Sequence, residues 1–144
     1  MSILEEVFLA LFFICIAGIG VCMLHKKDNI SFTDDQAIAA IVGEYSKQDY
    51  SGMKIFAHAI RNRKTLRGVY GLYAKHSRKE SKTIWELATL AWYESAAEVD
   101  TSFGSTAWYS RQDYERHHIP KGMKISLVYG NTIFFKPIKK EKKP

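Results

Sequence analysis

The chain has 144 residues, a net charge of +6 at pH 7 and 47% hydrophobic residues, so it holds one domain of modest size. Its two cysteines, Cys15 and Cys22, lie seven residues apart, about 10 Å along a helix, which excludes a disulfide between them. The excess of Lys and Arg favours anionic partners such as nucleic acid, acidic lipid head groups or acidic wall polymers.

The first element in chain order is an apolar run over residues 7–24, which has no charged or strongly polar side chain. A helix of this length spans about 27 Å, close to the hydrocarbon thickness of a bilayer. Glu5 and Glu6 precede the run, whereas a cleavable signal peptide begins with a basic region. We therefore expect residues 1–27 to form an uncleaved transmembrane anchor. Because these two acids are the only charges before Lys26, the net charge from residue 26 onward is +8.

The next segment, residues 28–35, reads as a linker that ends in a helix cap. Thr33 followed by Gln36 three residues later is a capping-box pattern, which marks the start of a helix. The helix that follows has apolar residues along one face: Ile38, Ile41, Val42 and Tyr45. Glu44 lies beside that face and next to Gly43, and a glycine inside a helix indicates that something packs close to it.

Two further helices are expected after this one. The first begins near Ser51 and has a buried stripe made of Met53, Phe56, Ala57 and Ile60. Residues 66–76 contain two glycines and two tyrosines and read as a loop. Ser81 or Thr83 caps the next helix, whose apolar residues cover more than one face, so we expect it to be central.

The end of the chain predicts a β-hairpin. Two strands, residues 125–129 and 132–135, flank a Gly130-Asn131 turn, whereas residues 94–122 show no regular pattern. Helices first and a small hairpin last indicate an α+β domain. Residues 139–144 form a basic tail.

Glu44 is the main candidate for chemistry. A carboxylic acid set against an apolar wall is how a glycosidase general acid is built. The ordinary alternative is a solvated glutamate, or one that pairs with Arg61, Arg63 or Arg67.

Several short sequence blocks in a fixed order are more specific than any one of them alone. They are Gly43-Glu44, Gly52-Met53, Ala57-x-Ala-Ile-Arg-Asn-Arg63, Thr65-Leu-Arg-Gly-Val-Tyr-Gly71, Trp92, Asp100-Thr101 with Gly104-Ser105-Thr106, Gly122-Met123, and Gly130-Asn131-Thr132 with Phe135. Together they resemble the SleB-type cell-wall hydrolases, which include spore-cortex lytic enzymes and smaller phage-encoded relatives. The resemblance covers residues 36–136, nearly all of the chain after the apolar run.

This resemblance implies a mainly helical catalytic domain over residues 36–138, similar to lysozymes and lytic transglycosylases. It implies an enzyme that cleaves the glycosidic bond between N-acetylmuramic acid and N-acetylglucosamine, with Glu44 as the general acid and base. A two-carboxylate glycosidase needs a partner carboxylate at roughly 5 to 9.5 Å, whereas a lytic transglycosylase needs only one. Because the resemblance implies a single catalytic carboxylate, that of Glu44, we expect lytic transglycosylation.

A second group of residues is expected to bind the substrate: Tyr70, Asp100, Thr106, Trp108 and Tyr109. Thr106 and Tyr109 are candidates for contacts to sugar or for a hydrogen bond that orients the acid. The aromatic rings of Tyr70 and Trp108 suit stacking on sugar faces. Asp100 is also a candidate second carboxylate, although a loop aspartate is ordinarily a cap or turn residue. The other candidates for a second carboxylate are Glu94, Glu98 and Asp113.

No metal and no other cofactor is expected. His117 and His118 are adjacent, so their side chains point in different directions, and no cysteine or third histidine stands near them at ligand spacing. His58 lies beside the buried stripe of its helix, where a structural histidine is ordinary.

The expected partners are peptidoglycan glycan strands and, through residues 7–24, a lipid membrane. We expect a single-pass protein of the bacterial inner membrane with its domain facing the periplasm, or a protein of a virion membrane that acts in penetration or lysis of a host wall. Lys26 and Lys27 follow the apolar run, and the positive-inside tendency would place the domain in the cytoplasm, which conflicts with a wall substrate.

Two other interpretations stay open. One is a catalytically inactive protein that binds peptidoglycan or holds a membrane assembly together. The other is a basic nucleic-acid-binding membrane protein, suggested by the net charge and by the cluster of cations over residues 61–67. No nucleic-acid motif supports the latter, so nucleic acid is not among the expected partners.

Overall fold

The computed structural model describes residues 31–45 and 49–139. The expected anchor, residues 1–27, and all but the first residue of the basic tail lie outside this part of the chain. Within the described ranges, no helix combines the length and the apolar character needed to cross a bilayer.

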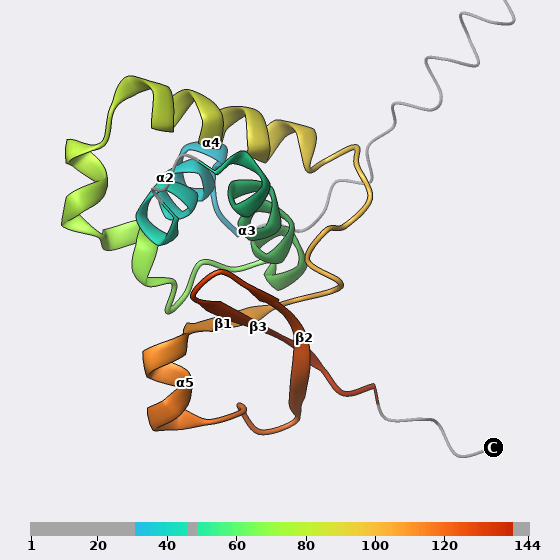
Figure 1. Cartoon of the computed structure of the whole chain (residues 1–144). Helices are drawn as coiled ribbons and strands as arrows, with labels where there is room; N and C mark the ends of the chain where they lie inside the picture. The colour runs from blue at the N-terminus through green and yellow to red at the C-terminus, as the bar shows by residue number, and fades with distance from the viewer. Residues whose placement is uncertain (1–30, 46–48, 140–144) are drawn as a thin grey trace, which may run out of the picture.

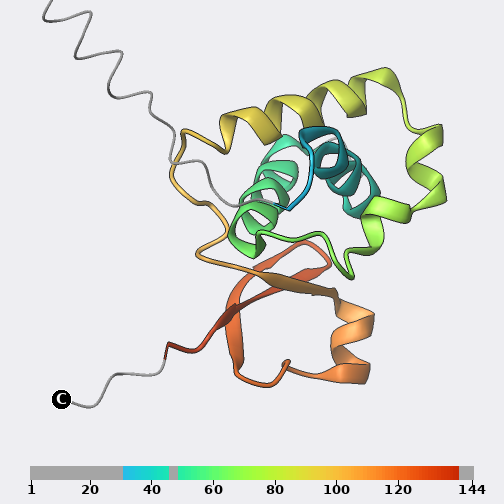
Figure 2. The same ribbon diagram turned by 180° about the vertical axis from the view of Figure 1, so that it is seen from behind.

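The described residues form an α+β fold, as expected, with four α-helices and a three-stranded antiparallel sheet. The α-helices are α2 (Asp34–Glu44), α3 (Tyr50–Arg63), α4 (Lys82–Glu94) and α5 (Arg111–His117), and two 3₁₀ turns, η1 (Tyr70–Tyr73) and η2 (Lys75–Lys79), connect α3 to α4. The strands are β1 (Ala107–Ser110), β2 (Met123–Tyr129) and β3 (Thr132–Pro137), in the order β1-β3-β2. Helices α2, α3 and α4 form one layer, and the sheet with α5 lies on one side of it (Figure 1; Figure 2 shows the same arrangement from behind).

Local sequence signals explain where the helices begin. The Thr33 hydroxyl accepts a hydrogen bond from the Gln36 amide while the Gln36 side chain bonds back to Thr33, so the predicted capping box is confirmed. Helix α3 begins one residue before the predicted start, because the Asp49 carboxylate accepts a hydrogen bond from the Gly52 amide. Of the two candidate caps for α4, Ser81 is the one used.

The core lies between the three main helices and one face of the sheet. The buried side chains of α2 and α3 that the apolar periodicity predicted are part of it, together with Trp92 of α4 and Phe134 of β3. Phe56 of α3 contacts Phe134 with ring centroids 5.1 Å apart, and this contact fixes the helical layer on the sheet. The sheet therefore holds a defined position relative to the end of α2.

The sheet is larger than the expected hairpin. Strands β2 and β3 form the predicted pair around Gly130, which has a φ of 54°, and Asn131. The strand β1 pairs with the other edge of β3, with Ala107 opposite Phe135 and Ser110 opposite Thr132. Strand β1 and α5 both lie in the segment in which the sequence shows no regular pattern.

Candidate functional site

The site begins where two glycines bring two backbones together. Gly43, in the last turn of α2, lies against Gly71 of η1, and a β carbon at Gly43 would overlap the Gly71 carbonyl group. A β carbon at Gly71 would in turn overlap the Ala40 carbonyl oxygen and the Glu44 side chain. Since neither position carries a side chain, the backbone of η1 packs directly on the end of α2. This confirms the close packing that a helix-interior glycine predicted.

The Glu44 carboxylate is held by two N–H donors. The Gly71 amide donates to Oε1 at 2.7 Å, and the Trp108 indole Nε1–H donates to Oε2 at 3.0 Å. The Glu44 side chain is half-buried and forms no ion pair with any described residue. The alternative of a glutamate paired with a neighbouring arginine is therefore wrong for the described part of the chain. Each carboxylate oxygen keeps a second lone pair that is free to accept a proton or a substrate hydroxyl.

Trp108 reaches Glu44 from β1. Its ring packs edge-on against Phe56, with centroids 5.5 Å apart, and lies 6.3 Å from the ring of Phe134. These core contacts fix the plane of the indole, so its N–H has one direction in which to donate. The guanidinium carbon of Arg63 lies 5.8 Å from the centroid of the same ring.

Glu44 lies in a cleft of about 630 Å³ between the end of α2, the loop before η1, and the β1–α5 segment. The cleft is lined by Gly43, Glu44, Arg63, Gly68, Val69, Tyr70, Ala107, Trp108, Tyr109, Ser110, Asp113, Pro120 and Met123. Tyr70 is 71% exposed, so its ring is available at the surface of the cleft. A cleft of this size with several aromatic rings suits a ligand of small-molecule or oligosaccharide dimensions.

Four of the six residues predicted for the site meet in this cleft: Glu44, Tyr70, Trp108 and Tyr109. Thr106 does not line it. The Thr106 amide donates to the Phe135 carbonyl, and the Thr106 carbonyl accepts from Arg63. Asp100 also does not line it. The hydrogen bonds expected to orient Glu44 come from Gly71 and Trp108 rather than from Thr106 or Tyr109.

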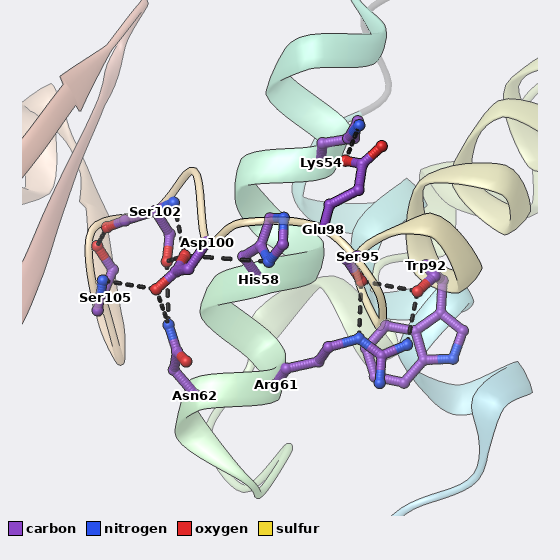
Figure 3. A network of polar contacts seen from close by, with 11 residues as sticks. Lys54, His58, Arg61, Asn62, Trp92, Ser95, Glu98, Asp100, Ser102 and Ser105 are labelled. Atoms are coloured by element: carbon purple, nitrogen blue, oxygen red, sulfur yellow. Dashed lines mark hydrogen bonds and ion pairs between the residues drawn. The ribbon is translucent and has the colours of Figure 1, made fainter. Parts of the chain in front are cut away.

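Asp100 lies at the centre of a polar network next to α3 (Figure 3). Its carboxylate accepts hydrogen bonds from the Asn62 side chain at 2.9 Å, from both the amide and the hydroxyl of Ser102, and from the Gly104 amide at 2.7 Å. Burial alone would raise the pKa of Asp100, but these hydrogen bonds outweigh it and hold the pKa below its ordinary value. The role that the contacts support is the ordinary one, an aspartate that fixes a turn.

His58 faces the same network from the buried side of α3. It is 3% exposed, and its Nδ1 is 4.0 Å from Asp100 Oδ1, which is too long for a hydrogen bond. Burial lowers the pKa of His58, against the opposing pull of the Asp100 charge. The lowered pKa of His58 favours the neutral imidazole at pH 7.

The Arg61-Asn62-Arg63 block connects α3 to three other segments. Arg61 donates to the Trp92 carbonyl and to the Ser95 hydroxyl, and its guanidinium lies 3.7 Å from the Trp92 ring centroid. Asn62 bonds to the Asp100 turn. Arg63 donates to the carbonyls of Thr106 and Arg67, and so ties the start of β1 to the loop before η1. Of the three side chains, only Arg63 lines the cleft.

The other three candidates for a second catalytic carboxylate, Glu94, Glu98 and Asp113, have different partners and positions. Glu94 accepts a hydrogen bond from the Tyr50 hydroxyl and pairs with Lys54, which also pairs with Glu98. Asp113 is the other acid in the Glu44 cleft, and it bonds to the hydroxyl of Ser110, the N-cap residue of α5. Of the four candidate second carboxylates, Asp113 is therefore the one that shares the cleft.

Sequence reasoning did not single out three of the residues that build this cleft. Gly71 is predicted only as part of a block. Arg63 is predicted as part of a block, as a possible ion-pair partner and as one of the cations over residues 61–67, and Ser110 is not predicted at all. The Ser110-x-x-Asp113 spacing is a helix-cap pattern and was the available signal for α5.

The two adjacent histidines have different neighbours, since His117 contacts Tyr109 and His118 contacts Tyr114.

The described residues contain no group of three His, Cys, Asp or Glu side chains placed to hold a metal ion. What the cleft offers is a fixed carboxylate, a cation, aromatic rings and a second acid. These groups suit acid–base chemistry on a polar ligand.

Compared with protein-family models, with curated proteins and with solved structures, the chain matches none.

Proposed function

We propose that this protein is a peptidoglycan-cleaving enzyme, a lytic transglycosylase that uses Glu44 as its general acid and base. The observation that supports this most directly is the position of Glu44 in a 630 Å³ cleft, with both oxygens oriented by N–H donors and with no ion pair to another described residue. A carboxylate that is fixed but unpaired has the geometry of a proton-transfer group rather than of a structural salt bridge.

The proposed reaction needs one carboxyl group. The Glu44 carboxylic acid protonates the oxygen between N-acetylmuramic acid and N-acetylglucosamine, and the C1–O bond breaks. The Glu44 carboxylate then takes the proton of the muramic 6-hydroxyl, whose oxygen bonds to C1 and closes a 1,6-anhydro ring. No water is consumed, and the muramic N-acetyl group shields the positive charge that develops at C1. Proton transfer of this kind contributes about 10²- to 10⁴-fold to the rate.

The side chains that line the cleft are of the types that bind sugars. Tyr70 and Tyr109 place aromatic rings along it, and such rings stack on the apolar faces of sugars. Arg63 adds a positive charge whose hydrogen bonds go to backbone carbonyls rather than to a carboxylate. A cation in this place suits a glycan whose attached stem peptides carry carboxylates.

Four of the eight sequence blocks that resemble SleB-type hydrolases contribute residues to this cleft, namely Gly43-Glu44, the block ending at Arg63, the Thr65–Gly71 block and Gly122-Met123, which supports membership of that family as part of the proposal. Gly43-Glu44 contacts Gly71 of the Thr65–Gly71 block, and Arg63 of a third block bonds to Thr106 of a fourth. Segments that are far apart in the sequence thus converge on one acid. We propose that this layer of helices, packed on a small sheet with the acid between them, is a lysozyme-like domain.

We further propose that the enzyme works at a membrane, held by residues 7–24, whose 18 apolar residues match the thickness of a bilayer. Its domain then faces peptidoglycan, in the bacterial periplasm or from the membrane of a virion.

A dye-release assay on purified, dye-labelled peptidoglycan tests the proposal. Wild-type protein is expected to release soluble dye, and Glu44→Gln to release it at least about 100-fold more slowly, because the general acid is lost while the side-chain shape is kept. Glu86→Gln is the matched control, since Glu86 is exposed on α4 and, among the described residues, pairs only with Lys82. Release by wild type that Glu44→Gln leaves unchanged would contradict the assignment of the site.

A further inference from the structure

A second hollow, which shares no lining residue with the Glu44 cleft, lies where β2 begins and β3 ends, beside the turn at Phe103 and Gly104. It has a volume of about 660 Å³ and is lined by Phe103, Gly104, Lys124, Lys136, Pro137, Ile138 and Lys139, which together we name the basic groove. Its lining has three cations and no acid. Among the described residues, none of these three ammonium groups has an ion-pair partner.

Two of the lysines repel one another. Lys124 of β2 and Lys136 of β3 are direct partners in the antiparallel register. Like charges directly opposite each other on neighbouring strands are destabilising, so this pair opposes folding unless an anion lies between them. The third, Lys139, is exposed and is followed in the sequence by Lys140, Glu141, Lys142 and Lys143.

Apolar side chains stand exposed beside these charges. Phe103 is 60% exposed and Ile138 is 53% exposed. Phe103 has a φ of 55°, in the left-handed region that is sterically unfavourable for a residue with a β carbon. The Asp100 network enforces this conformation, because the Asp100 carboxylate bonds to the amides on both sides of Phe103. A further hydrogen bond, between the hydroxyls of Ser105 and Ser126 at 2.7 Å, ties the same turn to β2.

We propose that the basic groove docks on the surface of an anionic phospholipid bilayer. The lysines bind lipid phosphates, and Phe103 and Ile138 enter the interfacial region between the head groups. Charge complementarity supports an anionic partner, and the exposed apolar pair distinguishes a bilayer from a soluble polyanion, which offers these side chains nothing in which to bury. The strained turn at Phe103 has a function in this arrangement: it holds the exposed phenyl ring next to the lysines of the groove. This proposal does not depend on the chemistry assigned to Glu44.

The test measures how fast lysines are acetylated in the full chain reconstituted into nanodiscs. One set of discs holds only phosphatidylcholine and the other holds equal parts of phosphatidylcholine and phosphatidylglycerol. In the anionic discs, Lys124 and Lys139 are expected to react at least about threefold more slowly, and high salt should remove this protection. Lys75 and Lys79, both exposed on η2, are the internal controls and should react equally in both discs.

Two variants keep the fold while they remove the docking surface. Phe103→Gly relieves the left-handed strain, because glycine adopts a positive φ without cost. Lys136→Glu replaces a repulsive cross-strand pair with an attractive one and lowers the charge of the groove. Both are expected to keep the melting temperature of wild type or to raise it, and to lose the protection of Lys124 in anionic discs.

Two results would overturn the proposal. One is equal acetylation of Lys124 and Lys139 in both kinds of disc. The other is protection of these lysines by soluble poly(glycerol phosphate) in neutral discs without protection in anionic discs, which would assign the groove to a wall polyanion instead. Protection that persists in Phe103→Gly but is lost in Lys136→Glu would also contradict the insertion of an aromatic ring.

Discussion

Gly43 and Gly71 lie in direct backbone contact, and this contact sets the position of the Glu44 carboxylate. The Gly71 amide donates to Glu44 Oε1, so the residue that permits the close approach also supplies one of the two donors. The other donor, Trp108, comes from the sheet. The acid is therefore held between the helical layer and the sheet by one bond from each side.

Gly43→Ala tests this contact. Alanine in the interior of a helix is ordinarily about 1 kcal/mol more favourable than glycine, so a helix-propensity effect alone would stabilise the protein. Here we expect the opposite sign, a loss of about 1 to 3 kcal/mol, because the added methyl group overlaps the Gly71 carbonyl group and η1 must move. Chemical denaturation of the full chain measures the change, and a more stable Gly43→Ala variant would show that the backbones are not in contact.

Trp108→Phe tests the indole hydrogen bond. The phenyl ring keeps most of the packing on Phe56 and Phe134 but has no N–H to donate to Glu44. We expect wall-cleaving activity to fall about 10- to 100-fold, the scale on which a misplaced catalytic group costs rate. The melting temperature should change much less than the activity does.

The matched control for this variant is Trp85→Phe. Trp85 is a half-buried tryptophan on α4, remote from the cleft lining, so the same chemical change is made there without touching Glu44. Equal activities in the two variants would mean that the Trp108 N–H does not position the acid.

Much of the helical layer could be predicted because its signals are local. The Thr33–Gln36 capping box lies within a few residues of the helix start that it determines. The Gly130-Asn131 turn likewise defines β2 and β3 without distant information. The cap and the turn involve neighbours in the sequence, whereas the glycine in α2 indicates a close contact without identifying its partner, Gly71, which is distant in the sequence.

The parts that the sequence did not predict depend on distant neighbours. All four residues of β1 are half-buried, so the strand shows no alternation, and its partner β3 lies more than twenty residues away. Helix α5 has no buried residue and therefore no apolar periodicity. The Glu44 hydrogen bonds span 27 and 64 residues, so no local pattern could identify Gly71 and Trp108 as the donors.

The stability of the folded protein at low pH is expected to depend on Asp49. Its carboxylate accepts hydrogen bonds from the hydroxyls of Tyr129 and Tyr45 and caps α3 through the Gly52 amide. The hydrogen bond from Tyr129 is the main cause that lowers the pKa of Asp49. Because the folded pKa lies below the unfolded one, the stabilisation is complete above the unfolded value of about 3.9 and is lost as the pH falls through the folded value.

Tyr129→Phe removes the main cause of that lowered pKa. We expect the variant to lose about 1 kcal/mol of stability at pH 7, the usual net value of a side-chain hydrogen bond, and to lose less below pH 3. Thermal melts of both proteins at the two pH values measure the difference. Tyr73→Phe is the control, because Tyr73 is 77% exposed. A loss that is the same at both pH values would show that the Asp49 charge is not involved.

The central claim is that one carboxyl group, that of Glu44, performs both proton transfers. Mass spectra of the muropeptides that the full chain releases from purified peptidoglycan test it most directly, with wild type, Glu44→Gln and Asp113→Asn compared side by side. The account predicts 1,6-anhydromuramic acid ends from wild type and from Asp113→Asn, and none from Glu44→Gln. Reducing muramic acid ends that disappear in Asp113→Asn would instead show attack by water with a second carboxylate. Anhydro products from Glu44→Gln at the wild-type level would contradict the assignment of Glu44.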